Sequence, residues 1–171
     1  MSGVRLWVLL ACALPAPVLA ADAAPQGLDK VMAYAGTWKT EIRHLDTPFS
    51  KAGSESLTLK NDCWRSGAFL ACDQIVDGDP KALLVFMYDA KGDIYASYPI
   101  TAGSSDVHPG TLIIKGKVWT FPWDATDAGK TTHFRVVNTW SSADSIEFRQ
   151  EYSSDGVQWT LMAEGHETRV K

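Results

Sequence analysis

The chain has 171 residues, with 16 basic and 20 acidic side chains and a formal net charge of −4. Because charges of both signs are mixed along the chain, the composition argues against a nucleic acid or an anionic membrane as the partner. The length suits a single domain with a sizeable core.

Residues 1–20 have the pattern of a secretory signal peptide. One positive charge, Arg5, precedes an apolar stretch, and small residues lead to a cut after Ala20. The stretch is too short, and too interrupted by proline, to span a bilayer about 30 Å thick. We therefore expect a secreted, periplasmic protein without a transmembrane segment. A lipoprotein acylated at Cys12 is the alternative, but cleavage there leaves an apolar region of about six residues, below the usual minimum of ~7.

Two cysteines, Cys63 and Cys72, remain after removal of the signal peptide. The residues between them suit a hairpin that turns at Gly67 and Ala68, which places the two sulfur atoms on facing strands. Disulfides persist in an oxidising compartment. We expect a structural disulfide, because the spacing is wider than that of a redox-active pair.

A short N-terminal segment, residues 21–35, precedes the main domain. It carries apolar residues at helical spacing, and Asp29 lies near the positive end of the helix dipole. These apolar residues are Leu28, Val31, Met32 and Ala35. We expect one short helix that lies on the domain as a lid.

Residues 36–171 form short segments of alternating apolar and polar side chains, separated by Gly, Asp, Ser and Pro. This pattern is typical of antiparallel β-structure. The segments predicted as strands are 38–45, 55–63, 69–76, 82–89, 93–101, 111–115, 117–123, 131–140, 144–152 and 157–170. Since tight turns join most of them, we predict an all-β domain: an antiparallel up-and-down barrel of about ten strands with a short N-terminal helix.

Alternation also predicts which side chains point into the barrel. If Trp38 points inward, so do Thr40, Ile42 and His44. Extending this reasoning to other strands gives the expected ligand-binding residues: His44, Tyr98, Trp119, Phe121, Phe134, Asn138, Phe148 and Gln150. The predicted shared faces are Ile94, Ala96, Tyr98 and Ile100 on one strand, and Trp159, Leu161, Ala163, Glu167 and Arg169 on the last.

The predicted interior combines aromatic and polar side chains. A dry core loses a few kcal/mol for each polar group left unpaired, so this mixture is typical of a cavity that holds water or an amphipathic ligand. Two interpretations of Glu167 and Arg169 stay open. They pair with each other or close the end of the barrel, or they belong to the cavity.

The helical lead-in, the motif Gly36-Thr37-Trp38 and the late Arg169 resemble the opening and closing signature of calycin-type barrels. That superfamily includes lipocalins, fatty-acid-binding proteins and nitrobindins. The resemblance implies structural roles for two residues: Trp38 packs under the barrel and Arg169 crosses it. The layout is also similar to a family of secreted bacterial proteins of unknown function, most clearly at residues 84–95.

Nitrobindin-like barrels bind haem through one histidine late in the chain, and His166 matches that place. Alternation puts His166 on the outer face unless Gly165 marks a bulge, whereas His44 points inward but lies on the first strand. Haem through His166 or His44 is therefore a minor alternative to a barrel without a cofactor. The histidines lack zinc spacing, so no metal site is predicted.

No motif in the chain identifies a reaction. The sequence favours a monomer or weak dimer that binds a small hydrophobic or amphipathic molecule. One alternative is an enzyme, an isomerase or hydrolase acting on a small apolar substrate. Another is a filled barrel that contacts an envelope protein through loops 106–110 and 124–130. An open interior would favour the carrier or the enzyme, and a filled one the interaction module.

Overall fold

A computed structural model describes residues 27–105, 107 and 109–171. The predicted signal peptide, its cleavage site, the alternative acylation site Cys12 and residues 21–26 lie outside the described residues. The elements are α1 (Leu28–Val31), η1 (Met32–Tyr34), β1 (Gly36–His44), β2 (Gly53–Ser66), β3 (Phe69–Val76), β4 (Asp79–Asp89), β5 (Ile94–Thr101), β6 (Gly110–Lys115), β7 (Val118–Asp127), β8 (Lys130–Ser142), β9 (Ser145–Ser153) and β10 (Thr160–Arg169). The predicted helix and all ten predicted strands are confirmed, with small shifts at their ends.

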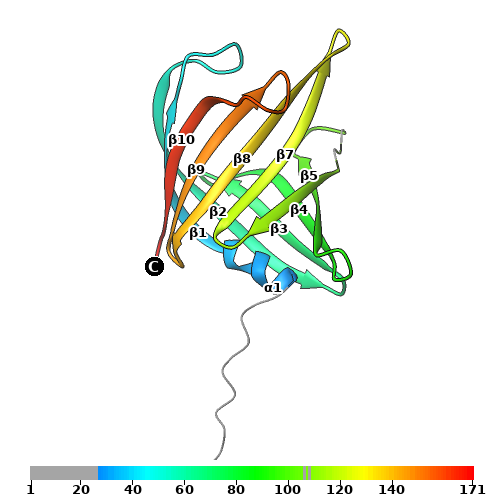
Figure 1. Cartoon of the computed structure of the whole chain (residues 1–171). Helices are drawn as coiled ribbons and strands as arrows, with labels where there is room; N and C mark the ends of the chain where they lie inside the picture. Colours follow the sequence, from blue (N-terminus) through cyan, green and yellow to red (C-terminus); the bar gives the residue numbers. More distant parts are fainter. Residues whose placement is uncertain (1–26, 106, 108) are drawn as a thin grey trace, which may run out of the picture.

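The strands form one closed barrel in which each strand pairs with its neighbours in sequence. β1 pairs with both β2 and β10, and all pairs are antiparallel (Figure 1). The predicted up-and-down barrel is therefore confirmed. None of the helices in the described part of the chain is long and apolar enough to cross a membrane.

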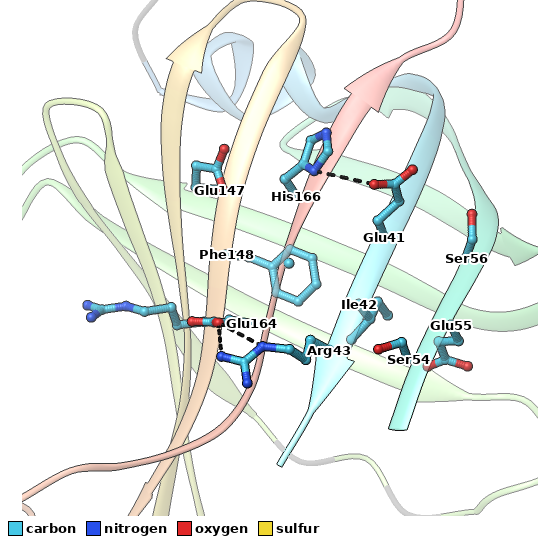
Figure 2. Close-up of a pocket in the computed structure, with 12 residues that line it drawn as sticks. Glu41, Ile42, Arg43, Ser54, Glu55, Ser56, Glu147, Phe148, Glu164 and His166 are labelled. Atoms are coloured by element: carbon cyan, nitrogen blue, oxygen red, sulfur yellow. Dashed lines mark hydrogen bonds and ion pairs between the residues drawn. The ribbon is translucent and has the colours of Figure 1, made fainter. Parts of the chain in front are cut away.

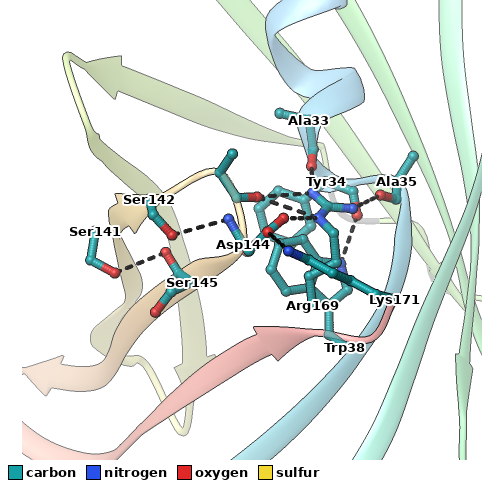
Figure 3. Close-up of polar contacts among 11 residues, drawn as sticks. Ala33, Tyr34, Ala35, Trp38, Ser141, Ser142, Asp144, Ser145, Arg169 and Lys171 are labelled. Atoms are coloured by element: carbon teal, nitrogen blue, oxygen red, sulfur yellow. Dashed lines mark hydrogen bonds and ion pairs between the residues drawn. The ribbon is translucent and has the colours of Figure 1, made fainter.

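The helical segment closes one end of the barrel. The indole Nε1 of the fully buried Trp38 donates a hydrogen bond to the Tyr34 carbonyl oxygen at 3.1 Å. The Arg169 guanidinium lies 4.1 Å from the centre of the Trp38 ring and donates to the Ala33 carbonyl oxygen at 2.8 Å. Its Nε lies 3.3 Å from a carboxylate oxygen of Asp144 (Figure 3). One arginine therefore joins the last strand, the first strand, the helical segment and the β8–β9 turn.

Aromatic rings gather toward the other end of the barrel. Phe49, in the loop after β1, packs edge-on against Phe134 and Tyr152 with ring centres 5.0 and 4.9 Å apart. Trp123 stacks on Phe134 at 5.4 Å. These side chains link the β1–β2 loop to strands β7, β8 and β9.

The predicted disulfide between Cys63 and Cys72 is present. The two residues face each other across β2 and β3, and residues 67 and 68 form the turn between the strands. Cys72 is buried, so the bridge belongs to the inner wall of the barrel.

One predicted inward face, that of the last strand, is wrong at Trp159 and Leu161 but correct at Ala163 and Glu167, and a second face is wrong throughout. The ladder between β9 and β10 shifts between Leu161 and Ala163, so that Leu161 pairs with the outward-facing Glu151. This bulge reverses the alternation for the residues before it, and Trp159 stacks on the guanidinium of Arg135 at 3.9 Å, outside the barrel.

The second error concerns β5. Tyr98 pairs with Val85, whereas Ser97 pairs with the cavity-lining Phe86. Directly opposite residues on neighbouring strands share a face. Tyr98 therefore lies on the outer face together with Ala96, and Tyr95 and Ser97 point inward.

Candidate functional site

The barrel encloses a cavity of about 410 Å³. The volume falls within the range of small-molecule pockets, which is roughly 300–1,000 Å³. Its lining consists of inward residues from eight strands and one residue of η1: Tyr34, Thr40, Ile42, Leu57, Leu59, Asn61, Cys72, Gln74, Val76, Leu84, Phe86, Phe121, Val136, Asn138, Phe148, Gln150 and Glu167. The interior of the barrel is therefore open, and most of its wall is apolar.

Tyr34 holds the polar side chains at the closed end of this cavity. The Asn138 amide donates a hydrogen bond to the Tyr34 hydroxyl, and the Asn61 amide donates to the Tyr34 carbonyl oxygen at 3.4 Å. Burial raises the pKa of Tyr34 well above its ordinary value, and the nearby Glu167 carboxylate raises it further. The phenol therefore stays neutral.

Three buried oxygen atoms of the lining have no hydrogen-bond partner in the part of the chain that the structure describes: Thr40 Oγ1, Asn61 Oδ1 and Glu167 Oε2. The three residues are 3%, 2% and 8% exposed. Each unsatisfied buried polar group costs about 1–3 kcal/mol. Since Thr40 and Glu167 face each other across β1 and β10, two of these oxygens lie on neighbouring positions of the wall. The cavity therefore has an apolar wall and polar groups with unused hydrogen-bonding capacity.

Glu167 is the most unusual of these groups. Burial raises the pKa of its carboxyl from 4.5 to about 7. The sequence left open a pair between Glu167 and Arg169, but the Arg169 guanidinium contacts Trp38, Asp144 and backbone carbonyls instead. Among the described residues no cation forms an ion pair with Glu167.

A second hollow, of about 640 Å³, lies beside the cavity between β5 and β7. It shares Leu84, Phe86 and Phe121 with the cavity lining. The wall is weak here, because β6 pairs with β5 only at residues 110–112 and with β7 only at residues 113–115. Pro99 and Pro122 line this hollow, as expected for proline beside an unpaired strand edge. We call this hollow the side opening, and part of its wall is also the wall of the cavity.

The structure separates the predicted ligand-binding residues into groups. Four of them line the cavity: Phe121, Asn138, Phe148 and Gln150. Trp119 is buried beneath it, where its ring contacts Tyr34 and Trp140. Phe134 lies in the aromatic cluster toward the other end, and Tyr98 borders the side opening from the outer face.

Neither predicted haem-binding histidine lines the cavity. His44 lies near the end of β1, where its Nε2 is 2.9 Å from a carboxylate oxygen of Glu55. His166 pairs with Glu41 and Glu147 across its two neighbouring strands, and its Nδ1 lies 3.9 Å from the Glu41 carboxylate. The bulge of β10 lies before Gly165, so His166 keeps the outward direction. The side chains of the cavity therefore do not fit a histidine-bound haem.

Figure 2 shows the outer face of β1, β9 and β10, where His166 lies. A shallow hollow of about 770 Å³ passes over Gly165 and is bordered mainly by charged and polar side chains. Arg43 binds Glu164 across this face. His166 also lies 3.9 Å from Glu41, and we assign this hollow no ligand.

Sequence reasoning missed several residues of the cavity. Asn61 alternates with exposed residues in β2, and this period-two signal would have identified it. Gln74 follows the exposed Asp73 but precedes the partly buried Ile75, so β3 has no clear period of two. No sequence signal identified Tyr34, because the apolar residues at helical spacing in this segment are its neighbours Val31, Met32 and Ala35 and not Tyr34 itself. Thr40 and Glu167 were predicted to point inward, but nothing in the sequence showed that their oxygens lack partners.

No family model and no curated protein matches the chain. Among solved structures, it is similar to the crystal structure of Rv2717c from M. tuberculosis, with 12% identity, a TM-score of 0.51, and coverage of 84% of this chain and 97% of that one. A redesigned β-barrel and EF1p2_mFAP2b bound to DFHBI each share 12% identity at a TM-score of 0.36. They are covered over 93% and 96% of their lengths, and this chain over 81% and 82%. The likeness to Rv2717c is one of fold alone, and that fold is a closed, ten-stranded antiparallel β-barrel.

Proposed function

We propose that the protein binds a small amphipathic molecule inside its barrel. The observation that carries this proposal is the cavity of about 410 Å³, in which apolar side chains surround three oxygen atoms without hydrogen-bond partners. Burial of a ligand's apolar part contributes about 25 cal/mol per Å². Hydrogen bonds to the unpartnered oxygens orient its polar part.

The open interior weighs against a filled barrel that serves only as an interaction module. Core side chains normally pack to the density of organic crystals, and few voids exceed one water molecule. A cavity with this volume and with unpaired polar groups lowers the stability of the protein. A ligand that fills the space and satisfies those groups offsets that cost.

Fluorescence titration with N-phenylnaphthylamine, an apolar probe without charge near neutral pH, tests the proposal. The matched variants are Leu84→Trp, which narrows the cavity, and Leu83→Trp on the opposite face of the same strand. We expect the wild type and Leu83→Trp to bind the probe, and Leu84→Trp to bind it roughly tenfold more weakly or not at all. Equal binding by both variants, or no binding by the folded wild type, would refute the proposal.

A proton-transfer enzyme, such as an isomerase, is the second candidate for this cavity. A buried carboxyl with a pKa of about 7 is suited to accept and return a proton near neutral pH. The measurement that separates the two functions is proton NMR of a ligand recovered from the purified protein and returned to it in deuterated water. A carrier leaves the ligand unchanged, whereas an isomerase introduces deuterium.

A further inference from the structure

The charges around the cavity are one-sided. Among the described residues of the lining, Glu167 supplies the only carboxyl group and no side chain is basic, while Tyr34 stays neutral and Cys72 is in a disulfide. The nearest arginine in the sequence, Arg169, is held by Trp38 and by carbonyl oxygens at the closed end. Among the described residues, the cavity wall therefore contains a carboxylate and no cation.

The buried atoms of the lining that lack a hydrogen-bond partner among the described residues are mostly acceptors. The amide groups of Asn61 and Asn138 both donate to Tyr34. Two of the unpartnered atoms, Asn61 Oδ1 and the ionised Glu167 Oε2, only accept hydrogen bonds, and Thr40 Oγ1 both accepts and donates. The lining also contains the amides of Gln74 and Gln150, which carry both donors and an acceptor. The fully buried oxygens without a partner all accept hydrogen bonds, so a ligand complementary to them brings donors.

A fatty acid does not fit this wall. Its carboxylate would add a second negative charge beside Glu167 and would bring no donor to the free oxygens. A primary amine fits, because its ammonium form carries three N–H donors and one positive charge. A buried charge is tolerated when it is paired and hydrogen-bonded. An ammonium group gives the Glu167 carboxylate both an opposite charge and N–H donors.

We propose that the ligand of this cavity is an aliphatic amine, whose ammonium group binds the Glu167 carboxylate and whose apolar chain lies against the wall around Phe121 and Phe148. The inference rests on the proposed ligand-binding function and names the chemical class of the ligand. Thr40 pairs with Glu167 across β1 and β10, so its hydroxyl oxygen can accept a second hydrogen bond from the ammonium group.

Binding of the amine depends on pH, because Glu167 must lose its proton to form the ion pair. The group that faces Glu167 from η1 is Tyr34, and its raised pKa keeps it neutral. The residues opposite Glu167 are Thr40 on β1 and Ile146 on β9, and neither titrates. Affinity therefore rises as the pH increases through about 7, the pKa of free Glu167, and falls only near the pKa of the amine, about 10.

The test compares three probes that share one apolar chain: octylamine, octanol and octanoate. Each displaces N-phenylnaphthylamine from the wild type at about pH 8, where both the amine and Glu167 are ionised. We expect octylamine to bind roughly tenfold more tightly than octanol, and octanoate to bind most weakly. The octylamine affinity should fall by roughly tenfold between pH 8 and pH 6, while that of octanol changes little.

Glu167→Gln, which keeps the shape of the side chain, provides the second arm. The ratio of octylamine to octanol affinity should fall by roughly tenfold in this variant, and Glu147→Gln on the outer face serves as the control. Octanoate binding as tightly as octylamine, or an unchanged affinity ratio in folded Glu167→Gln, would overturn the inference. If the variant does not fold, the comparison of probes on the wild type decides the question alone. Failure of N-phenylnaphthylamine to bind at all refutes the proposed function, whereas binding without preference for the amine refutes only this inference.

Discussion

Replacing Glu167 with glutamine should make the protein more stable at alkaline pH and leave its stability nearly unchanged in acid. The carboxyl is 8% exposed, and burial raises its pKa from 4.5 to about 7. Below about pH 4.5 the carboxyl is protonated in both the folded and the unfolded protein. As the pH rises toward 7, the unfolded chain loses this proton while the folded protein keeps it, so the free energy of unfolding falls. Above about 7 both states are ionised and the loss is complete.

The size of the effect follows from the two pKa values. Each pH unit between 4.5 and about 7 lowers the free energy of unfolding by about 1.4 kcal/mol, which gives a total of about 3 kcal/mol. Glu167→Gln has no proton to lose and should not show this decrease. The difference in stability between variant and wild type should therefore grow by about 3 kcal/mol from acid to alkaline pH. In the melting temperature this corresponds to roughly 6–12 °C for a domain of this size.

Urea unfolding of both proteins across this pH range, followed by tryptophan fluorescence, measures the difference directly. Glu147→Gln is the matched control, because its carboxyl is exposed on the outer face of the neighbouring strand. A difference between Glu167→Gln and the wild type that stays constant across the pH range would refute the argument. In that case the Glu167 carboxyl either ionises as a solvated group or finds a cation inside the barrel.

Three further predictions concern the ends and the wall of the barrel. Arg169→Ala removes the stacking on Trp38, the hydrogen bond to Ala33 and the pair with Asp144, and should lower the free energy of unfolding by about 2–4 kcal/mol. Arg169→Lys, which keeps the charge but not the planar fork, should recover less than half of that loss in the same urea assay; full recovery would show that charge alone matters. The double variant Cys63→Ser, Cys72→Ser should lose about 2–3 kcal/mol, because the bridge closes a loop with a sequence separation of 9 residues. An unchanged melting temperature on reduction would contradict this estimate. The intact mass of protein exported by its own host should correspond to a chain that starts at Ala21, and a mass that includes an acylated Cys12 would establish the lipoprotein instead.

The barrel could be predicted from the sequence because the charges alternate clearly on some strands. In β1 the charged Lys39, Glu41 and Arg43 separate residues of the opposite face, and only one register buries the apolar set. β9 shows the same separation. Alternation therefore identifies Phe148 and Gln150 on β9 as inward residues, and the same period of two on β8 identifies Asn138.

Alternation could not fix the phase of β5, because apolar residues occupy both of its faces from Ile94 to Ile100. A period of two carries no information when neither face is polar. The β10 bulge lies in a similarly apolar stretch around Met162, where one additional residue leaves no sign in the sequence. Tyr98 and Trp159 were misplaced for these two reasons.

The central feature of the candidate site was also beyond sequence reasoning. Glu167 and Arg169 lie two positions apart on one face of β10, and such a pair of opposite charges usually suggests an ion pair. The structure directs Arg169 to the closed end and leaves Glu167 in the cavity, because Trp38 and the carbonyl oxygens of the helical segment bind the guanidinium. The distance between the Arg169 guanidinium and the Glu167 carboxyl depends on how the helical segment around Tyr34 packs on the barrel. No local sequence pattern predicts that packing.

A crystal structure of the wild-type protein grown with octylamine tests the account most directly. We predict that the amine lies inside the barrel, with its nitrogen within hydrogen-bonding distance of the Glu167 carboxylate and its chain between Phe121 and Phe148. A barrel whose interior is filled by its own side chains, or an amine found only on the outer face, would contradict it.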